Sequence, residues 1–131
     1  MISTRGRYAL RVLVDIAYNQ QEGHVPMKDV ANRRGLSLKY LEQILPPLTK
    51  HGLIEGVQGK GGGYRLTREP KDYKIGEILR LTEKDLAPVG CLKEGAPVCE
   101  RRTSCRTVGF WEGLNNTVNE YLDSKTLEDL M

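Results

Sequence analysis

The segment "HGLIEGVQGKGGGYRLT", residues 51–67, places four glycines within positions 59–63, between two stretches of β-prone residues. The apolar residues of these two stretches are Leu53, Ile54, Val57, Tyr64 and Leu66. Two short β-prone arms joined by a glycine-rich tip are typical of a β-hairpin. Glycine suits such a tip because it adopts positive φ angles and lets the backbone approach another surface closely.

Two other interpretations of the glycine cluster do not fit. A phosphate-binding loop follows the pattern GxxxxGK[ST] and leads from a strand into a helix. Here no Ser or Thr follows Lys60, and the next residues are β-prone. A flexible linker would not have apolar residues on both sides of the tip. The segment therefore predicts a hairpin in which Lys60 and Arg65 can reach phosphates or a narrow minor groove.

The residues before the hairpin predict two short helices. One follows Pro26 and runs to Arg34, where Gly35 suits a left-handed helix stop. Ser37 is placed to cap the second helix, "SLKYLEQIL", residues 37–45. Two such helices joined by a turn with a glycine are typical of a helix-turn-helix, although an ordinary helical corner has the same pattern. With the hairpin after them, they predict a winged helix-turn-helix that binds DNA.

Two consecutive prolines, Pro46 and Pro47, follow the second of these helices. A proline in a helix interior removes a backbone donor and clashes with the preceding turn, at a cost of about 3 kcal/mol. We therefore expect the helix to kink or end near Leu45, with a separate short turn over residues 48–50.

The N-terminal segment predicts another helix, which Ser3 or Thr4 can cap. Its apolar residues recur at helical spacing, and its polar side has several arginines. The apolar residues are Ala9, Val12, Leu13, Ile16 and Ala17, and the arginines are Arg5, Arg7 and Arg11. Residues 1–74 hold 13 Lys and Arg against 7 Asp and Glu, whereas residues 75–131 hold 7 against 10. The basic front half is where a polyanion would bind.

The residues after the hairpin predict a short helix, "KIGEILRLTE", residues 74–83, and a longer one that begins at Thr107. The longer helix has two adjoining apolar stripes: Val108, Trp111, Val118 and Leu122, and beside them Phe110, Leu114, Thr117 and Tyr121. So wide a band predicts a helix that packs against its own copy in a homodimer, with Asn115 on the seam. The alternative is a helix that packs back onto its own domain. Thr126, with Asp129 three positions later, can cap a last turn.

The totals bound the class of protein. At 131 residues the chain fits one domain, or one small domain with an appendage. No apolar run approaches the ~20 residues of a membrane span, and the N-terminus lacks a secretory cleavage pattern. We therefore expect a cytoplasmic protein without a membrane partner, in which cysteines bind metal or sense redox more often than they form structural disulfides.

Three cysteines, Cys91, Cys99 and Cys105, lie within 15 residues of one predicted loop in the pattern C-x7-C-x5-C. Neighbouring arginines lower the pKa of a thiol and favour the thiolate, which binds metal and reacts with oxidants. Three thiolates suit an iron–sulfur cluster or zinc, but both usually take four ligands, so Glu100 or a residue of a partner subunit is considered as the fourth. Unliganded thiols and a redox-switch disulfide remain alternatives. No acid/base or nucleophile pair lies beside the cysteines, so a metal-thiolate enzyme is not expected.

Several segments together carry a family resemblance: "STRGRYALRVLVDIA", "SLKYLEQIL", "GLIEGVQGKGGGYRL", "IGEIL", the three loop cysteines and "FWEGL". Over essentially its whole length the chain resembles the iron–sulfur-cluster regulator (IscR-like) winged-helix family, which includes iron–sulfur, nitric-oxide and cysteine-metabolism regulators. The resemblance implies a homodimeric bacterial transcription factor. Its third helix would enter the major groove, its wing the minor groove, and its C-terminal helix would pair the subunits.

The resemblance also implies which residues contact the operator. Those on the recognition helix are Ser37, Lys39, Tyr40, Glu42 and Gln43. Gln43 can pair with adenine edges, Lys39 and Tyr40 can reach phosphates or bases, and Glu42 can accept from cytosine or repel the backbone. Core packing is the alternative role for Tyr40. Arg5, Arg7, Gln58, Lys60 and Arg65 complete the expected DNA-contacting set.

The chain departs from the family pattern at two places. Gln58 stands in the wing where the iron–sulfur regulators commonly have arginine, with Lys60 nearby. Val108 stands three positions after the last cysteine, where those regulators have a histidine. The nitric-oxide sensors have an N-terminal aspartate ligand that has no counterpart here. The resemblance thus implies a cluster, of the 2Fe–2S type, on the three cysteines, with its fourth ligand open.

The expected fold is mainly α with a small β-hairpin: a winged helix-turn-helix domain plus a long C-terminal dimerisation helix. We expect the winged domain over residues 1–82, a cysteine-bearing loop over 83–106, and the dimerisation helix with its C-terminal turn over 107–131. The predicted function is a non-enzymatic, operator-binding regulator that senses iron–sulfur status, redox state or nitric oxide. The alternative is the same regulator without a cluster, controlled by thiol oxidation or by a protein partner.

Overall fold

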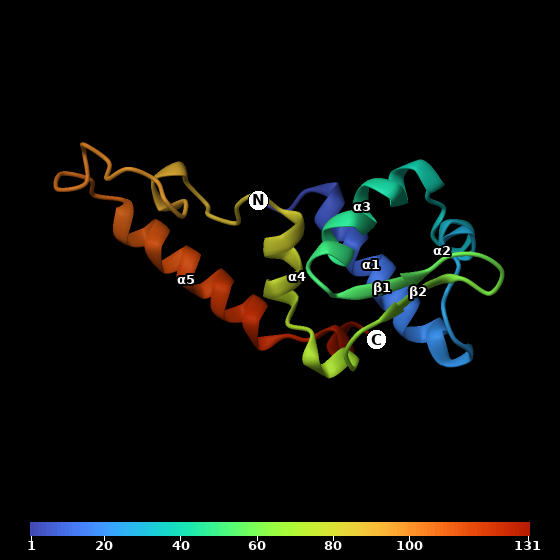
Figure 1. The fold of residues 1–131 in the computed structure, drawn as a ribbon. Coiled ribbons are helices and arrows are strands. Elements are labelled where there is room, and N and C mark those ends of the chain that lie inside the picture. Colours follow the sequence, from blue (N-terminus) through green and yellow to red (C-terminus); the bar gives the residue numbers. More distant parts are fainter.

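Five helices and one two-stranded sheet make up the computed structural model, which describes residues 1–131 apart from the side chain of Glu22 (Figure 1). The elements in chain order are α1 (Thr4–Asn19), α2 (Met27–Arg34), α3 (Leu38–Lys50), β1 (Ile54–Val57), β2 (Gly63–Leu66), α4 (Ile75–Thr82) and α5 (Val108–Ser124). The predicted class, mainly helical with a small hairpin, is confirmed.

The hydrophobic core lies between α1, α3, α4 and the base of the hairpin. On α1 it takes the apolar stripe that the sequence predicts, with Val12, Leu13 and Ile16 fully buried. Ser3 caps this helix by accepting a hydrogen bond from the Gly6 backbone N–H at 3.4 Å. The other fully buried apolar side chains include Leu41, Ile44, Leu48, Leu53, Tyr73, Ile78 and Leu127. The core therefore joins the helix-turn-helix to the hairpin and to α4.

The turn between α2 and α3 has the predicted form. Gly35 adopts a left-handed conformation with φ of 64°, and the Leu36 N–H donates to the Ala31 carbonyl at 3.0 Å. Ser37 caps α3 by accepting from the Tyr40 N–H at 3.0 Å. The glycine closes α2 and the serine opens α3, which confirms the helix-turn-helix.

Of the two outcomes expected near Leu45, an end of the helix with a separate turn after it is wrong, because α3 continues through Pro46 and Pro47 to Lys50. The two prolines leave the carbonyls of Glu42 and Gln43 without their helical donors. Glu42, Gln43 and Pro46 are all exposed, so water can satisfy these carbonyls. Buried leucines and isoleucine on the opposite side hold both halves of the helix against the core; they are Leu41, Ile44, Leu45 and Leu48.

The hairpin that forms the wing pairs β1 with β2 in antiparallel register, from Ile54 opposite Leu66 to Val57 opposite Gly63. The backbone of Val25 extends this sheet, since it exchanges hydrogen bonds of 2.7 and 2.9 Å with Tyr64. Gly63 permits this close approach: its φ is 146°, and an added Cβ would lie 2.3 Å from the Val25 carbonyl oxygen. The hairpin and its glycine tip are thus confirmed.

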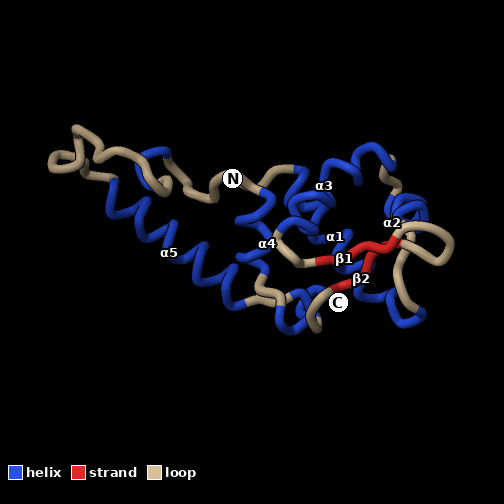
Figure 2. Tube along the Cα trace, in the orientation of Figure 1, coloured by secondary structure: helices blue, strands red, loops and turns tan.

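The long loop after α4 runs outward to the far end of the molecule, and α5 runs back beside it toward the winged part (Figures 1 and 2). None of the described side chains of α5 is fully buried. After α5 the chain returns to the core through a 3-10 turn, Leu127–Leu130, which the predicted Thr126–Asp129 capping box opens. The Leu127 N–H donates to the Tyr73 carbonyl, and the Ile75 N–H donates to the Lys125 carbonyl, both at 2.9 Å. None of the described helices has the length and apolarity needed to cross a bilayer.

Candidate nucleic-acid interface

The solvent face of α3 is the first part of the candidate interface. Lys39, Glu42 and Gln43 are exposed on it, while Leu41 and Ile44, which alternate with them, are buried in the core. Ser37 is exposed at the N-terminus of the same helix, and its hydroxyl is engaged by the Tyr40 N–H. The helix therefore presents a polar, hydrogen-bonding face whose position is fixed by packing on the opposite side.

Tyr40 is half-buried and packs against the core, which fits the packing role expected for it, while a contact with DNA stays a prediction. Its ring packs edge-on against that of Tyr8 on α1, with centroids 5.6 Å apart, and Arg11 lies over the Tyr8 ring at 4.9 Å. The stack brings the exposed Arg11 guanidinium next to the first turn of α3. The sequence places Arg11 on the polar side of α1, but only the Tyr8–Tyr40 contact reveals its position beside the recognition helix.

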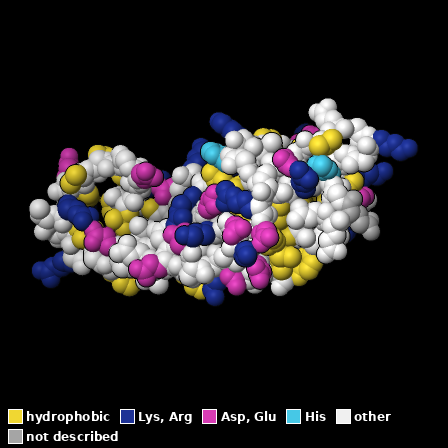
Figure 3. All heavy atoms as spheres, turned by 60° about the horizontal axis from the view of Figure 1, so that its bottom comes forward, with side chains coloured by type: hydrophobic (Ala, Val, Ile, Leu, Met, Phe, Trp, Pro, Cys, Tyr) yellow, Lys and Arg dark blue, Asp and Glu magenta, His cyan; other side chains and the backbone are white. Residues whose placement is uncertain are grey.

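The wing tip is the second part of the interface. Gln58 and Lys60 are exposed in the turn beyond the β1–β2 ladder, where the backbone is bent by Gly59 and Gly61, with φ of 93° and 78°. In the space-filling view, basic side chains project at the end of the molecule where the wing lies (Figure 3). Arg65 lies within the ladder opposite Glu55 and forms an ion pair with it, and its contact with phosphates stays a prediction.

The N-terminus of α1 is the third part. Arg5 and Arg7 are exposed there, and Arg7 donates to the Thr4 hydroxyl at 3.3 Å. The same turn is tied to the end of α4, since the Ser3 backbone N–H and hydroxyl both donate to Glu83 at 2.8 Å. Glu83 is the first residue of the cysteine-bearing loop, so this loop begins next to two of the expected DNA-contacting arginines.

A buried ion pair holds the helix-turn-helix in place. The Asp15 carboxylate is fully buried and accepts from Arg33 at 2.6 Å and from Arg34 at 2.8 Å. Burial alone would raise the pKa of Asp15, but hydrogen bonds and charge from both arginines hold that pKa below its ordinary value. The pair ties α1 to the last turn of α2. Sequence reasoning missed it, because no local pattern links Asp15 to arginines 18 and 19 residues further along the chain.

The three cysteines are free, exposed and gathered around one pocket of about 160 Å³. The other residues that line it are Ala96, Pro97, Val98, Arg102 and Val108. Hydrogen bonds from the side chain and backbone of Thr107 lower the pKa of the Cys105 thiol, and the charge of Arg102 contributes less. Arg102 is also ion-paired with Glu112 on α5.

Cysteine thiolates are the type of ligand that an iron–sulfur cluster takes, but a cluster usually has four ligands and only three cysteines are present. Among the described residues, no group of three or more His, Cys, Asp or Glu side chains is arranged to hold a metal ion. Glu100, considered as a fourth ligand, does not line the cysteine pocket, and Val108, which does, cannot bind iron. The pocket thus gathers three thiols, with no fourth ligand among the residues that line it.

α5 has one covered and one free side. Val108, Trp111 and Leu122 are half-buried, whereas Phe110 is 67% and Tyr121 is 62% exposed. Asn115 lies on the covered side, where it lines a cavity with Leu86 and Leu92 and its side-chain oxygen accepts from Asn119 at 3.1 Å. The expectation that Asn115 lies on the seam between two copies of the helix stays a prediction, since within one chain it packs on the covered side of α5.

Comparison with known proteins gives consistent matches over the whole chain. The model of the Rrf2 family, described as an iron-dependent transcriptional regulator, matches residues 2–131. The chain is 36% identical over 130 residues to the HTH-type transcriptional regulator IscR of Aliivibrio salmonicida, covering 99% of this chain and 76% of that protein.

Two solved structures are similar over 99% of the chain. CymR, the global cysteine regulator of B. subtilis, gives a TM-score of 0.82 at 36% identity, with 95% of its chain covered. IscR of T. potens gives a TM-score of 0.77 at 39% identity, with 85% covered. The matched relatives are named as transcriptional regulators and not as enzymes.

Proposed function

The chain belongs to the Rrf2 family of transcriptional regulators, and on that premise we propose that it is a homodimeric, sequence-specific DNA-binding regulator controlled through its cysteine loop. The proposal treats residues 1–82 as the DNA-binding unit, 83–106 as the sensory loop and 107–131 as the dimerisation segment. A regulator of this kind acts in the cytoplasm, the compartment that reduced cysteines also favour.

The observation that carries the proposal is the exposed polar face of α3. A recognition helix must present hydrogen-bonding side chains to base edges while its other side is locked by packing. Gln43 can donate and accept at an adenine edge, Glu42 can accept from cytosine, and Lys39 can reach a phosphate or a guanine. Each of these side chains is exposed, and Leu41 between them and Ile44 directly after them are buried.

The wing and the N-terminus of α1 would supply the phosphate contacts. Lys60 at the wing tip, with Gln58 beside it, would lie along the minor groove, and Arg5, Arg7 and Arg11 would lie along the backbone flanking the major groove. Arg65 would contribute less than the others, because Glu55 already neutralises it. These contacts fix the register of the protein on DNA, whereas α3 determines the sequence that is bound.

Dimerisation would use the free side of α5. Phe110, Leu114 and Tyr121 are exposed at helical spacing on that side, and they bury apolar area only if a second copy covers them. Two recognition helices related by a twofold axis would then contact half-sites about 34 Å apart, or a multiple of that distance. The operator is accordingly expected to be a pseudo-palindrome.

A cluster of the 2Fe–2S type is the proposed group at the cysteine loop. Cys91, Cys99 and Cys105 would hold it, with the fourth ligand from outside the pocket. Its chemistry would make the order of the loop depend on iron supply, oxidants or nitric oxide. The support for this is the family and the three thiols that line one pocket.

Thiol-based control without a cluster is the second candidate, and two observations favour it. The three cysteines are exposed and free, with no fourth ligand among the residues that line their pocket. The chain is also structurally similar to a protein named as a global cysteine regulator. In this case oxidation of the thiols, or binding of a protein partner, would replace cluster loading as the signal.

Selection from a random DNA library by the purified full-length protein tests DNA recognition. The expected result is a pseudo-palindromic consensus that the protein binds as a dimer. Recovery of no consensus, with a protein that stays monomeric in sedimentation, would contradict the proposal.

Anaerobic purification distinguishes regulation by a cluster from regulation by thiols. The cluster is supported if the wild type absorbs between 300 and 500 nm and the C91A/C99A/C105A variant does not. The operator affinity of the variant should then also differ from that of the wild type. A colourless protein whose operator affinity changes with thiol oxidation supports the second candidate. If the operator affinity were equal in cluster-loaded, oxidised and cysteine-free protein, the proposed sensory role of the loop would be contradicted.

A further inference from the structure

We propose that Arg80 on α4 and Asp123 on α5 form a clasp that fixes the direction of α5 relative to the winged domain, and thereby sets the half-site spacing that the dimer accepts. Arg80 and Asp123 are then positioning residues that touch no DNA. The inference rests on the proposed dimeric DNA binding and goes beyond it, because it assigns spacing selectivity to a contact outside both the interface with DNA and the cysteine loop.

The clasp is a bidentate pair with an added hydrogen bond. One Arg80 nitrogen donates to Asp123 Oδ1 at 2.8 Å, and the other donates to Asp123 Oδ2 at 3.1 Å and to Asn119 Oδ1 at 2.7 Å. Asn119 is itself held by a hydrogen bond of 2.9 Å to the Asn115 carbonyl. A planar guanidinium that engages two side chains one turn apart restrains both the tilt and the rotation of α5.

Gly76 leaves room on α4 for the side chains of the clasp. It lies one turn before Arg80, and a Cβ added there would be 2.2 Å from Asp123 Oδ1 and 2.8 Å from an Arg80 nitrogen. Any larger residue at position 76 would therefore displace the carboxylate. The absence of a side chain at this buried position creates the space in which the clasp forms.

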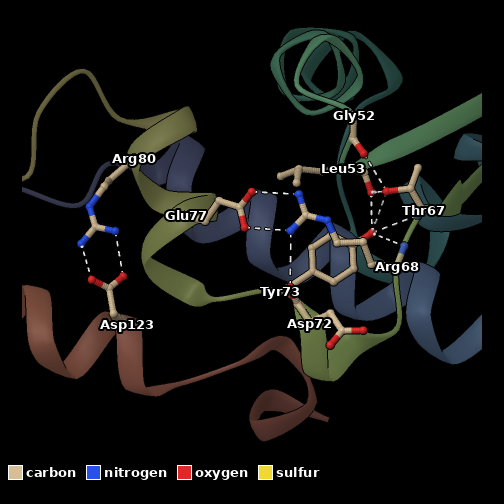
Figure 4. A network of polar contacts seen from close by, with 9 residues as sticks. All are labelled: Gly52, Leu53, Thr67, Arg68, Asp72, Tyr73, Glu77, Arg80 and Asp123. Carbon is tan, nitrogen blue, oxygen red and sulfur yellow. Dashed lines mark hydrogen bonds and ion pairs between the residues drawn. The ribbon is translucent and has the colours of Figure 1, made fainter.

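The same helix is held to the wing by a second bidentate pair. Glu77 accepts from Arg68 at 2.8 and 2.9 Å, and the Arg68 backbone N–H donates to the Tyr73 hydroxyl at 3.2 Å. That hydroxyl donates to the carbonyl of Leu53, directly before β1, at 2.6 Å. Figure 4 shows the two pairs on α4, one directed toward the wing base and the other toward α5. α4 is thus the rigid link between the wing and the dimerisation helix.

A small tilt of α5 at the clasp moves the far end of this helix by a large distance. α5 has 17 residues and is about 25 Å long at 1.5 Å per residue. A tilt of about 10° at the clasp moves the far end of such a helix by about 4 Å, more than the ~3.4 Å between successive base pairs. The clasp side chains are each 42% exposed, so their pairing contributes little to folding stability. The clasp is therefore expected to affect the direction of α5 and not the folding of the domain.

The test uses R80M and D123N in the full-length protein, with K71M as the matched control. Lys71 forms an ion pair with Glu69 at 3.2 Å within the winged domain, so K71M removes one positive charge as R80M does, without touching α5. D123N changes the net charge in the opposite direction. An effect shared by R80M and D123N and absent from K71M cannot come from net charge.

Each protein is titrated by fluorescence anisotropy against the consensus DNA selected by the wild type and against versions with one base pair added or removed between the half-sites. Wild type and K71M are expected to discriminate against the altered spacings by about 10-fold or more. R80M and D123N should discriminate by about 3-fold or less, or prefer a new spacing, while their affinity for a single half-site stays within about 2-fold of wild type.

Retention of the wild-type spacing profile by both variants would overturn the inference and leave the proposed function intact. A wild type that selects no DNA would instead refute the proposed function and this inference with it. Thermal unfolding of each variant is measured in parallel, and R80K provides a gentler change that keeps the charge but loses the bidentate geometry. A spacing profile that follows the loss of folded protein, and not the loss of the clasp, would also count against the proposal.

Discussion

Asp15 illustrates how one residue positions the DNA-binding elements without contacting DNA. Its carboxylate is fully buried, and both arginines that precede the helix-turn-helix glycine bind it. Removing one partner of a buried ion pair is costly because the other charge loses its compensation. Here the arginines are 37% and 39% exposed, so water can recover part of that loss.

We expect D15N to lower the free energy of unfolding by about 2–3 kcal/mol, at the lower end of the range for a broken buried pair. Urea denaturation followed by circular dichroism measures this. Asp72 is exposed, so D72N is the matched control and should change stability by less than about 0.5 kcal/mol. A D15N protein as stable as D72N would show that the pair has no structural role.

The pH dependence of stability follows from the same residue. The pKa of Asp15 is lower in the folded protein than in the unfolded chain, so the unfolded chain takes up the proton first as the pH falls. The stabilisation is fully present above the unfolded pKa of about 4, and it is lost as the pH falls through the folded value. Glu77 and Asp123, whose pKa values are also lowered by arginine partners, act in the same direction.

Unfolding free energies measured between pH 3 and pH 7 should therefore fall below about pH 5 in the wild type. The fall should be shallower in D15N, because one of the responsible carboxylates is gone. Parallel curves for the two proteins would contradict the assignment of acid sensitivity to this residue.

At the scale of elements, α3 shows where local sequence signals succeed and fail. Gly35 and Ser37 predict the turn because capping is decided by neighbours in the chain. Pro46 and Pro47 wrongly suggest that the helix ends. The free-energy cost of proline in a helix depends on whether water reaches the carbonyls four residues earlier, and the core contacts of Ile44 and Leu48 offset it. Neither is visible in a local pattern, so the helix proves longer than the sequence suggests.

Replacement of the exposed Pro46 by alanine should stabilise the protein by about 1–2 kcal/mol, because the helical backbone donor returns and the steric cost disappears. The loss of proline rigidity in the unfolded chain offsets a part of this gain. Pro70 stands at the first position of a 3-10 turn, where proline fits, so P70A should destabilise slightly. Thermal unfolding measures both, and a destabilised P46A would contradict the account of α3.

The wing gives a prediction that separates phosphate contacts from base contacts. K60A should weaken binding about equally on all DNA sequences and reduce the slope of log affinity against log salt by about 1 for each subunit. Q43A should relax discrimination at one base pair by about 1–3 kcal/mol and leave the slope unchanged. Anisotropy titrations at several salt concentrations measure both effects. If K60A weakened binding to some DNA sequences more than to others, the assignment of Lys60 to phosphate contacts would be contradicted.

At the scale of the whole molecule, the fold is largely predictable and the couplings within it are not. The glycine cluster, the caps and the apolar stripes are local, and each of the predicted helices and the hairpin is present. The contacts that join them span long stretches of chain: Asp15 to Arg33 is 18 residues, and Arg80 to Asp123 is 43. Periodicity and spacing contain no signal for such pairs. The cysteines were predictable as a group, and all three line one pocket.

The arrangement of the parts suggests how a change in the loop reaches DNA. The loop begins at Glu83, which holds the N-terminus of α1, and it ends at α5, whose direction the Arg80–Asp123 clasp fixes. Ordering of the loop would therefore act on the N-terminus of α1 and on α5, which both contact the C-terminal end of α4. In a dimer, such a change would alter the separation of two recognition helices and not the chemistry of either one.

The central claim, that a dimer binds duplex DNA through phosphates and bases, is tested most directly by the salt dependence of affinity for the selected consensus. With six to ten phosphate contacts, log affinity should fall against log salt with a slope of about −5 to −9, and the bound species should sediment as two chains on one duplex. A slope near zero, or a bound monomer with equal affinity for unrelated DNA, would contradict it.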